Sequence, residues 1–376
     1  MAVKLTDLKL QDFQDFDNHE RVVLIEDDTT NLTAVVSIHN NNLGPAMGGC
    51  RFYPYKTREE GYKDVLRLSR GMTYKSALAN LALGGGKSII FGDARADKTR
   101  DMLQSFGEGL EKLGGAYITA EDVGTNEADM LTISSQTSYV MGLPPSADNP
   151  LSGNPSPHTS QGVFTALEGL ANEIYDDANA LRGKRCGVMG LGAVGYGVAQ
   201  KLNAAGAQLI VADINTEACA RAEAEFADVK ILGSDELLKT ELDIFVPCAM
   251  GGVFDLDTIA LLKTEIICGA ANNQLATGRA EDRALYDGGM IYAPDYVVNA
   301  GGIIAVAYAY YHATDTNPYA WDLTPETLAK HVESIRATTL NIFNISRENN
   351  TPPGFVADEL AENIFRNGVK PDLKIA

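Results

Sequence analysis

Hydrophobic and polar positions along the chain follow two different periods. Short apolar runs between turn-forming residues predict strands in the first half at 21–25, 32–38, 88–91 and 116–120. Apolar positions at helical spacing predict helices at about 58–80 and 99–113. From about residue 185 strands alternate with helices, and the later strands are expected at 208–212, 243–247, 265–269 and 290–293. This alternation predicts an α/β protein whose second half is a doubly wound parallel sheet.

A proline-rich stretch at 144–157 divides the chain. It holds five of the 14 prolines, so it fits neither a helix nor a central strand. Helices predicted after Thr324 have no evident place in the parallel sheet, and we expect them to pack back toward the first domain. The expected domains are therefore 1–148 with about 345–376, and 149–344, joined by two crossings that act as a hinge.

Composition excludes several classes of protein. A net charge of −19, from 50 acids against 31 bases, argues against nucleic acid or an anionic membrane as a partner. No apolar run reaches 18 residues and the N-terminus has no secretory core, so a cytoplasmic protein is expected. The five cysteines are scattered without a C-x-x-C pair, so neither a metal site nor a disulfide framework is expected.

Residues 71–92 carry Lys75 and Lys87 in an apolar run that has no carboxylate. One such lysine could lie along the surface with its ammonium in water, but two together favour a site. A partly desolvated amine near a second cation has a lowered pKa and can act as a base. We therefore interpret Lys87 as a candidate base and Lys75 as an anchor for an anion, with the glycines at 84–86 letting the backbone approach a ligand.

Asp122 follows the strand expected at 116–120. A carboxylate at the carboxyl end of such a strand points into the crevice where α/β sheets bind ligands. The alternative is a helix N-cap or a turn residue. Together with Lys87, Asp122 is a candidate for proton exchange.

A G-x-G-x-x-G motif, Gly190-Leu-Gly192-Ala-Val-Gly195, follows a strand and leads into a helix at about 194–205. The next strand ends in Asp213, the position of an acid that binds the ribose hydroxyls of a dinucleotide. That carboxylate repels an added 2′-phosphate, so NAD is favoured over NADP. Incidental glycines in a flavodoxin-like sheet would leave Asp213 unexplained. Loops after the later strands are expected to line the cofactor site, at 248–252, 271–274 and 295–302.

The motifs together resemble one family. They include Gly-Pro-Ala-Met-Gly-Gly (44–49), Gly-Met-Thr-Tyr-Lys (71–75), Gly-Gly-Gly-Lys (84–87), Thr-Ala-Glu-Asp-Val-Gly (119–124), Ser-Gly-Asn-Pro-Ser-Pro (152–157), Gly-Leu-Gly-Ala-Val-Gly (190–195), Ala-Asn-Asn-Gln-Leu (271–275) and Ala-Pro-Asp-Tyr-Val-Val-Asn-Ala-Gly-Gly (293–302). The chain resembles, from about 20 to 345, the bacterial amino-acid dehydrogenases acting on Leu, Val or Phe, relatives of glutamate dehydrogenase. The resemblance implies a substrate domain, a Rossmann domain that binds NAD, and a homo-oligomer, either a dimer or an octamer.

The resemblance also implies roles for particular residues. Lys75, with the backbone of Gly48 and Gly49, would hold the substrate α-carboxylate, Lys87 would activate water, and Asp122 would exchange protons with the amino group. The reaction would convert an apolar L-amino acid to the 2-oxo acid, ammonia and NADH. The implied cofactor-binding residues are Gly190, Gly192, Ala193, Val194, Gly195, Asp213, Cys248, Ala249, Asn272 and Asn299, and Asn272 would also contact the substrate.

The side-chain pocket implied by the resemblance is apolar. Met47 and Val306 take the places where glutamate-specific relatives have a lysine and a serine, so a distal carboxylate would be left unpaired. The further expected walls are Met72, Ala120 and Ile303. Ala120 favours a branched aliphatic substrate, leucine with valine and isoleucine. Gly-Gly-Gly-Lys and Tyr53-Pro-Tyr55 resemble the phenylalanine-type members more, so an aromatic substrate is the alternative.

Two other functions compete with this interpretation. A different Rossmann oxidoreductase, of the hydroxy-acid or malic type, would need a histidine, a metal or a Tyr-Lys pair near the hydride site. The five histidines, at 19, 39, 158, 312 and 331, form no such constellation in the sequence. An NAD sensor without turnover would not need Lys75, Lys87 and Asp122 together.

Overall fold

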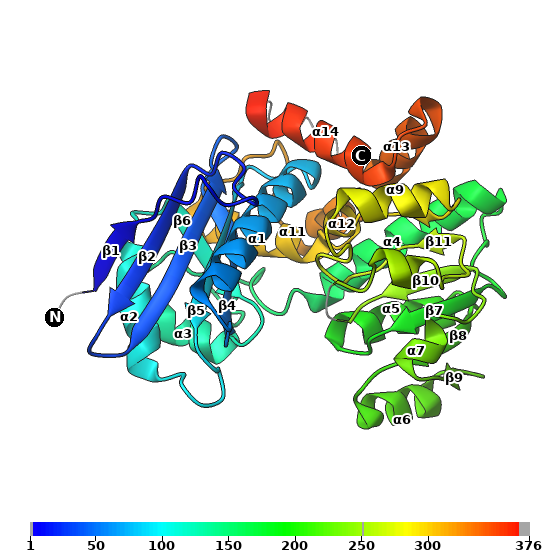
Figure 1. The fold of residues 1–376 in the computed structure, drawn as a ribbon, viewed down its shortest axis with the longest axis horizontal. Helices are drawn as coiled ribbons and strands as arrows, with labels where there is room; N and C mark the ends of the chain where they lie inside the picture. The colour runs from blue at the N-terminus through cyan, green and yellow to red at the C-terminus, as the bar shows by residue number, and fades with distance from the viewer. Residues whose placement is uncertain (1–2, 250–251, 368–376) are drawn as a thin grey trace. The chain divides into compact units, whose positions relative to one another are not determined.

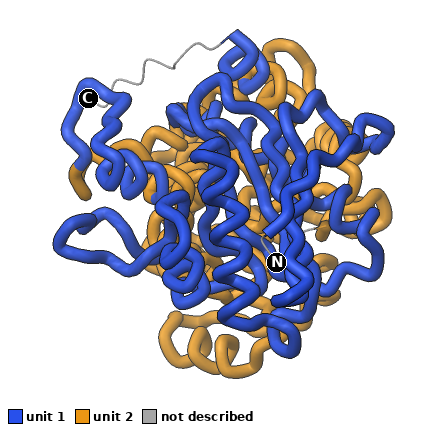
Figure 2. Tube along the Cα trace, turned by 90° about the vertical axis from the view of Figure 1, so that its left-hand side faces the viewer, with its two compact units in different colours: residues 1–154, 306–323, 361–374 blue, residues 155–305, 324–360, 375–376 orange. Residues whose placement is uncertain are grey.

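A computed structural model describes residues 3–249 and 252–367 of the chain and divides them into two compact units. Unit 1 comprises 3–154, 306–323 and 361–367, and unit 2 comprises 155–305 and 324–360 (Figure 2). The first crossing thus falls inside the proline-rich stretch. In the described residues no helix is both long enough and apolar enough to span a bilayer, and no group of three or more His, Cys, Asp or Glu side chains is placed to hold a metal.

Unit 1 is built on a six-stranded mixed sheet in the order β1-β2-β3-β5-β4-β6 (Figure 1). The strands are β1 (Lys4–Asp7), β2 (Arg21–Asp27), β3 (Leu32–Asn40), β4 (Ala46–Tyr53), β5 (Gly84–Phe91) and β6 (Tyr117–Glu121). The first four in this order pair antiparallel, whereas β4 lies between β5 and β6 and runs parallel to both. β4 therefore separates the middle of β5 from the end of β6.

Helices cover both faces of this sheet. Helix α1 (Arg58–Leu78) packs Val65 and Leu66 against Ile89 on one face. Helices α2 (Arg100–Glu111) and α3 (Glu127–Ser134) pack against the other face, where Phe106 and Ile133 are fully buried. Thr57 and Thr99 begin α1 and α2 as N-caps, which is why these helices begin close to the expected residues.

Two glycine-rich segments belong to strands in the structure. Gly48 and Gly49 lie within β4, and Gly84, Gly85 and Gly86 open β5. A Cβ at Gly48 would lie 1.8 Å from the carbonyl oxygen of Gly86, and one at Gly85 would lie 2.0 Å from the amide nitrogen of Thr73. At 84–86 glycine therefore serves the close packing of the protein's own elements, and the expected approach of a ligand to this backbone is not what requires it.

Unit 2 contains a parallel sheet in the order β12-β11-β10-β7-β8-β9. Its strands are β7 (Arg185–Met189), β8 (Gln208–Ala212), β9 (Lys230–Ile231), β10 (Ile244–Pro247), β11 (Ile266–Ile267) and β12 (Ile291–Tyr292). All five pairs are parallel, and numbered by position in the chain this is the order 3-2-1-4-5-6 of dinucleotide-binding sheets. The expected doubly wound sheet is confirmed, and its switch point lies between β7 and β10.

The helices of unit 2 connect and cover these strands (Figure 1). They are α4 (Ser156–Tyr175), α5 (Ala193–Ala204), α6 (Thr216–Glu225), α7 (Ser234–Leu237), α8 (Leu256–Ile259), α9 (Arg279–Asp287) and α10 (Asp295–Val298). Val163, Leu167 and Leu170 of α4 are buried along one stripe, as their spacing predicts.

The last four helices are α11 (Gly301–Thr314), α12 (Pro325–Glu333), α13 (Ile335–Asn349) and α14 (Pro353–Asn367). The helix expected from 325 is interrupted at Ser334, and both α12 and α13 pack on α4 in unit 2. The reason is local, because Ile335 fits against Gly162 and Arg336 pairs with Glu168. Only from Ala361 does α14 contribute to unit 1, so the observed division differs from the boundary expected near 345. Residues 368–376, part of that expected segment, lie outside the described residues.

Candidate active site and cofactor turn

Lys87 lies in the middle of β5 with its side chain only 8% exposed. It precedes Ile89 by two residues, and because side chains alternate along a strand, Lys87 also leaves the sheet on the face covered by α1. Its Nζ is 2.7 Å from Oδ2 of Asp122, which directly follows β6. The structure therefore brings together the two side chains that the sequence suggested for proton transfer.

Asp122 is held from several sides. Its Oδ2 also accepts a hydrogen bond from Nε of Arg51 at 3.2 Å, and its amide donates to Oγ1 of Thr125 at 2.9 Å. That hydroxyl in turn donates to the carbonyl of Cys50 at 2.8 Å. Burial alone would raise the pKa of Asp122, but the charges of Lys87 and Arg51 outweigh burial and hold this pKa well below its ordinary value. Asp122 is thus a carboxylate fixed between two cations.

Gly49 of β4 lies directly beside this pair. A Cβ added there would be 2.7 Å from Cβ of Asp122 and 3.1 Å from Nζ of Lys87. The site therefore has no room for a side chain at position 49, and the backbone of β4 forms its floor.

Lys75 lies in the last turn of α1 and is half-buried. Met72 is on the preceding turn and is also half-buried. Helix α1 packs on β5. Arg51, which the sequence interpretation had given no role, contacts Asp122 of the pair directly.

The expected pocket walls lie on four elements, of which α1 carries Met72. Met47 is fully buried in β4, and Ala120 at the end of β6 is half-buried opposite Gly49 in the register. Ile303 and Val306 are half-buried about one turn apart on α11. Ala120 and Val306 of unit 1 and Ile303 of unit 2 thus each keep some exposed apolar surface.

The glycine motif forms the turn between β7 and α5, and each glycine has a distinct reason. Gly190 has φ +99°, and a Cβ on Gly195 would lie 2.0 Å from the carbonyl oxygen of Gly190. A Cβ on Gly192 would meet nothing within 4 Å, and Gly192 caps α5 without any side-chain hydrogen bond. Open space above uncapped N–H groups at a helix N-terminus is what a pyrophosphate requires, so these residues fit a dinucleotide. Ala193 and Val194 form the first turn of this helix.

Asp213 follows β8, and both of its carboxylate oxygens accept backbone hydrogen bonds. Oδ2 accepts from the amide of Leu191 at 2.5 Å, and Oδ1 accepts from the amide of Asn215 at 2.7 Å. Asp213 therefore fixes the glycine turn itself. A carboxylate has about four lone-pair positions, so ribose hydroxyls can still be accepted.

Two asparagines meet at the carboxyl ends of β11 and β12. Asn299 is buried and donates from Nδ2 to Oδ1 of Asn272 at 2.9 Å and to the carbonyl of Ala270 at 3.1 Å. Asn272 itself is exposed. After β10, Cys248 is half-buried and Ala249 exposed, whereas residues 250 and 251 of the expected loop lie outside the described residues.

The sequence interpretation missed Arg51 and its partners Asp64 and Tyr55. Nη1 of Arg51 is 2.8 Å from Oδ2 of Asp64, and the Tyr55 hydroxyl donates to the same oxygen. The available signal was alternation along β4, since Gly49 and Arg51 two residues later share a face.

The sequence and the two-unit α/β fold of this chain both match known proteins. A family model described as the dimerisation domain of Glu/Leu/Phe/Val dehydrogenase matches residues 19–139, and one described as Glutamate/Leucine/Phenylalanine/Valine dehydrogenase matches 213–353. Leucine dehydrogenase of Geobacillus stearothermophilus is 43% identical over 345 residues, covering 92% of this chain and 90% of that protein.

Two further relatives extend the comparison. Valine dehydrogenase of Streptomyces virginiae is 42% identical over 92% of this chain and 93% of its own length. The crystal structure of L-tryptophan dehydrogenase from Nostoc punctiforme superposes with a TM-score of 0.76 at 36% identity, covering 93% of this chain and 97% of the other. The chain belongs to the Glu/Leu/Phe/Val dehydrogenase family.

Proposed function

We propose that this protein is an NAD-dependent amino-acid dehydrogenase that acts on L-leucine and similar branched aliphatic amino acids. The reaction consumes the amino acid, NAD⁺ and water and yields the 2-oxo acid, ammonium, NADH and a proton. The observation that carries the proposal is the buried Lys87 amine held 2.7 Å from the Asp122 carboxylate beside the side-chain-free Gly49. A family in which relatives named for leucine and valine are 40–43% identical to this chain supports it.

Each of the three charged residues has a chemical task. Lys75, with the backbone at Gly48 and Gly49, binds the α-carboxylate of the substrate. Asp122 accepts a proton from the substrate's amino group and returns it when ammonia leaves. Lys87 removes a proton from the water that attacks the imine carbon and then stabilises the resulting carbinolamine.

The proton of Lys87 has a short path. Its Nζ already points to Oδ2 of Asp122, so a proton moves between the two groups along one hydrogen bond of 2.7 Å.

The turn from Gly190 to Gly195, the N-terminus of α5 and Asp213 would hold NAD. When bound, NAD supplies the acceptor for the substrate's hydride. Asp213 repels a 2′-phosphate, so we expect the ratio kcat/KM for NAD to exceed that for NADP by at least about tenfold, which corresponds to about 1.4 kcal/mol.

The apolar surfaces of Met72, Ala120, Ile303 and Val306 support an aliphatic side chain, and an aromatic amino acid is the alternative. The relative named L-tryptophan dehydrogenase supports that alternative, because it is named for an aromatic amino acid. One methylene is worth only about 1–3 kcal/mol in such a pocket, so activity on leucine, valine and isoleucine should overlap. We also propose a homo-oligomer, because the family model over 19–139 is described as a dimerisation domain.

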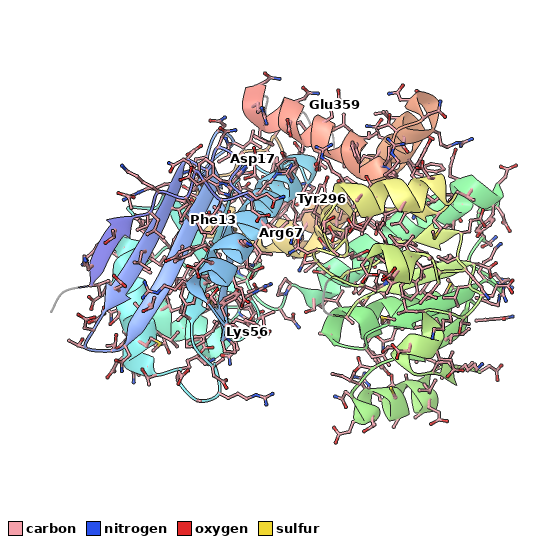
Figure 3. The ribbon with its side chains drawn as sticks, in the orientation of Figure 1. Phe13, Asp17, Lys56, Arg67, Tyr296 and Glu359 are labelled. Carbon is pink, nitrogen blue, oxygen red and sulfur yellow. The ribbon has the colours of Figure 1, made fainter. Side chains whose placement is uncertain are left out.

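The test is an initial-rate panel of L-amino acids with NAD and NADP, read by absorbance of the reduced cofactor. Leucine, valine and isoleucine should give the highest kcat/KM with NAD. Lys87→Ala should lower kcat by about 10²–10⁴-fold, the usual contribution of a general base, while NAD binding survives. The matched control is Lys56→Ala, at an exposed lysine of the same unit (Figure 3). Full turnover in Lys87→Ala, or no turnover with any amino acid in the unaltered protein, would refute the proposal.

A further inference from the structure

Arg51 connects Asp122 to a second carboxylate. Its guanidinium is 19% exposed and contacts Asp122 through Nε at 3.2 Å and Asp64 of α1 through Nη1 at 2.8 Å. The same Asp64 oxygen accepts a hydrogen bond from the Tyr55 hydroxyl. Arg51 is therefore itself fixed by two groups outside the candidate active site.

Both cations bind the same oxygen of Asp122. Lys87 reaches Oδ2 from β5, and Arg51 reaches Oδ2 from β4. Two donors that converge on Oδ2 fix the rotation of the carboxylate, and the backbone amide of Val123 also hydrogen-bonds to this carboxylate. A carboxylate with one anchored oxygen presents the other in a defined direction.

We propose that Arg51 is the positioning residue of the Lys87–Asp122 pair, which holds Asp122 by one oxygen and presents the other to the amino group of the substrate. The inference rests on the proposed function and adds a residue to it. Asp64 and Tyr55 complete the support by holding the guanidinium. Arg51 acts through Asp122 and makes no contact with substrate in this role.

A purely structural role is the competing explanation, because Arg51 also ties β4 to α1. Such a tie would lower stability and reduce activity by the same factor at every pH. A positioning role predicts more, since Arg51 is one of the two cations that lower the pKa of Asp122. Without Arg51 this pKa rises, and the acidic limb of kcat/KM moves to higher pH.

Other titratable groups near Asp122 do not replace Arg51. They are Lys87 on β5, Cys50 on β4, Tyr117 and Glu121 on β6, Asp64 on α1 and Asp129 on α3. Burial raises the pKa of Cys50 to about 12 and raises that of Tyr117 further, so both are neutral at neutral pH. Lys87 then remains paired with Asp122, and Lys98, which contacts the carbonyl of Gly124, pairs with Asp129.

The experiment compares Arg51→Met, Arg51→Lys and the control Arg21→Met. Arg21 pairs with Asp7 in the same unit, but both side chains are well exposed, at 41% and 67%. We expect Arg51→Met to lower kcat for L-leucine about tenfold to a hundredfold, to leave the KM for NAD unchanged and to move the acidic limb up by about one pH unit, as loss of one nearby opposite charge does. Arg51→Lys should recover part of both effects, and Arg21→Met should show neither.

A readout without turnover separates this inference from the proposed function. The carboxyl ¹³C signal of Asp122, assigned by its absence in Asp122→Asn, should titrate at higher pH in Arg51→Met than in the unaltered protein. If amino acids are not turned over but the titration shifts, the proposed function fails and the electrostatic link stands. If Arg51→Met does not fold, Arg51→Gln, which removes the same charge but keeps a polar head group, should give the same shifts. An unmoved carboxyl titration, or equal loss of activity at every pH with no recovery in Arg51→Lys, would overturn the inference.

Discussion

Removing the charge of Asp122 and removing the charge of Lys87 should lower the stability of unit 1 by different amounts. Asp122→Asn leaves the Lys87 ammonium, 8% exposed, without the carboxylate that the described residues provide. Lys87→Met leaves Asp122 with Arg51 still 3.2 Å away. The first substitution leaves a buried charge without its counter-charge and the second does not, so Asp122→Asn should destabilise unit 1 more than Lys87→Met.

The magnitude follows from the burial of the pair. Removing one partner of a buried ion pair costs about 3–5 kcal/mol, and we expect this for Asp122→Asn. For Lys87→Met the remaining Arg51 and the retained apolar stem reduce the expected loss to about 1–2 kcal/mol, the cost of one charged hydrogen bond. In a unit of this size 1 kcal/mol corresponds to about 2–4 °C, so a difference of about 1–4 kcal/mol should separate the two melting temperatures by about 2–16 °C.

The direction in which the stability contribution changes with pH is set by the pKa of Asp122. Its folded pKa lies well below the unfolded value of about 3.9, so the folded chain binds fewer protons in acid and the contribution is fully present above pH ~5. That contribution is lost as the pH falls through the folded pKa. The difference between Asp122→Asn and the unaltered protein should therefore be constant from about pH 6 to 8 and shrink in acid.

Trp321 provides the assay. It is the single tryptophan of the chain, belongs to unit 1 and stacks on Tyr319 with ring centroids 4.4 Å apart. Its fluorescence in urea therefore follows unit 1, which matters because two-unit chains often unfold in more than one step. Arg21→Met, in an exposed pair, should change the midpoint little. A larger loss in Lys87→Met than in Asp122→Asn would refute this assignment of charges.

Two further outcomes are expected from unit 1. Burial lowers the pKa of His19 to about 4, below its unfolded value of about 6.5, so the contribution of His19 to stability is complete above pH 6.5 and is lost as the pH falls toward 4. In His19→Gln the urea midpoint should therefore depend less on pH between about 6.5 and 4, and an unchanged dependence would contradict this prediction. Gly48→Ala should prevent folding or lower the melting temperature by more than about 10 °C, because its Cβ would lie 1.8 Å from the Gly86 carbonyl oxygen, whereas Gly71→Ala, with nothing within 4 Å, should stabilise α1 by up to about 1 kcal/mol in the same thermal melt.

Unit 2 could be predicted from its sequence because its information is local. Each strand is followed by a helix, and the Gly190–Gly195 turn specifies both the sheet edge and its ligand class. The strands β9, β11 and β12 are only two residues long, yet flanking helices fix their order. In a parallel sheet the rules for strand connections leave few possible strand orders once the alternation of strands and helices is known.

The glycines of unit 1 could not be interpreted in the same way. Glycine indicates either a turn or a close approach, and only the partner decides between them. At Gly85 the partner is the amide of Thr73 on α1, and at Gly86 it is the ring of Tyr117 on β6. Both contacts depend on the tertiary fold, so the three glycines are interpreted from the sequence as a place for a ligand to approach, and the strand is expected to begin only at Ser88.

Arg51 escaped prediction for a related reason. Its two carboxylates are 13 and 71 residues away in sequence, on α1 and after β6. Likewise His19 and His39 form a buried pair with ring centroids 4.8 Å apart, although 20 residues separate them in the chain (39 − 19). Such side-chain contacts follow from the order of the strands in the sheet, which the sequence of unit 1 does not specify.

Strand order also explains why the candidate site needs a glycine at position 49. In the order β5-β4-β6, Lys87 and Asp122 stand on strands that are two spacings apart, about 9.5 Å. Their side chains meet only by reaching over β4, and the residue beneath them is Gly49, where a Cβ would lie within 3.1 Å of both. Arg51, two residues further along the same face, reaches the pair from beside this gap. The absence of one side chain thus permits the ion pair, and the next side chain on that face fixes its direction.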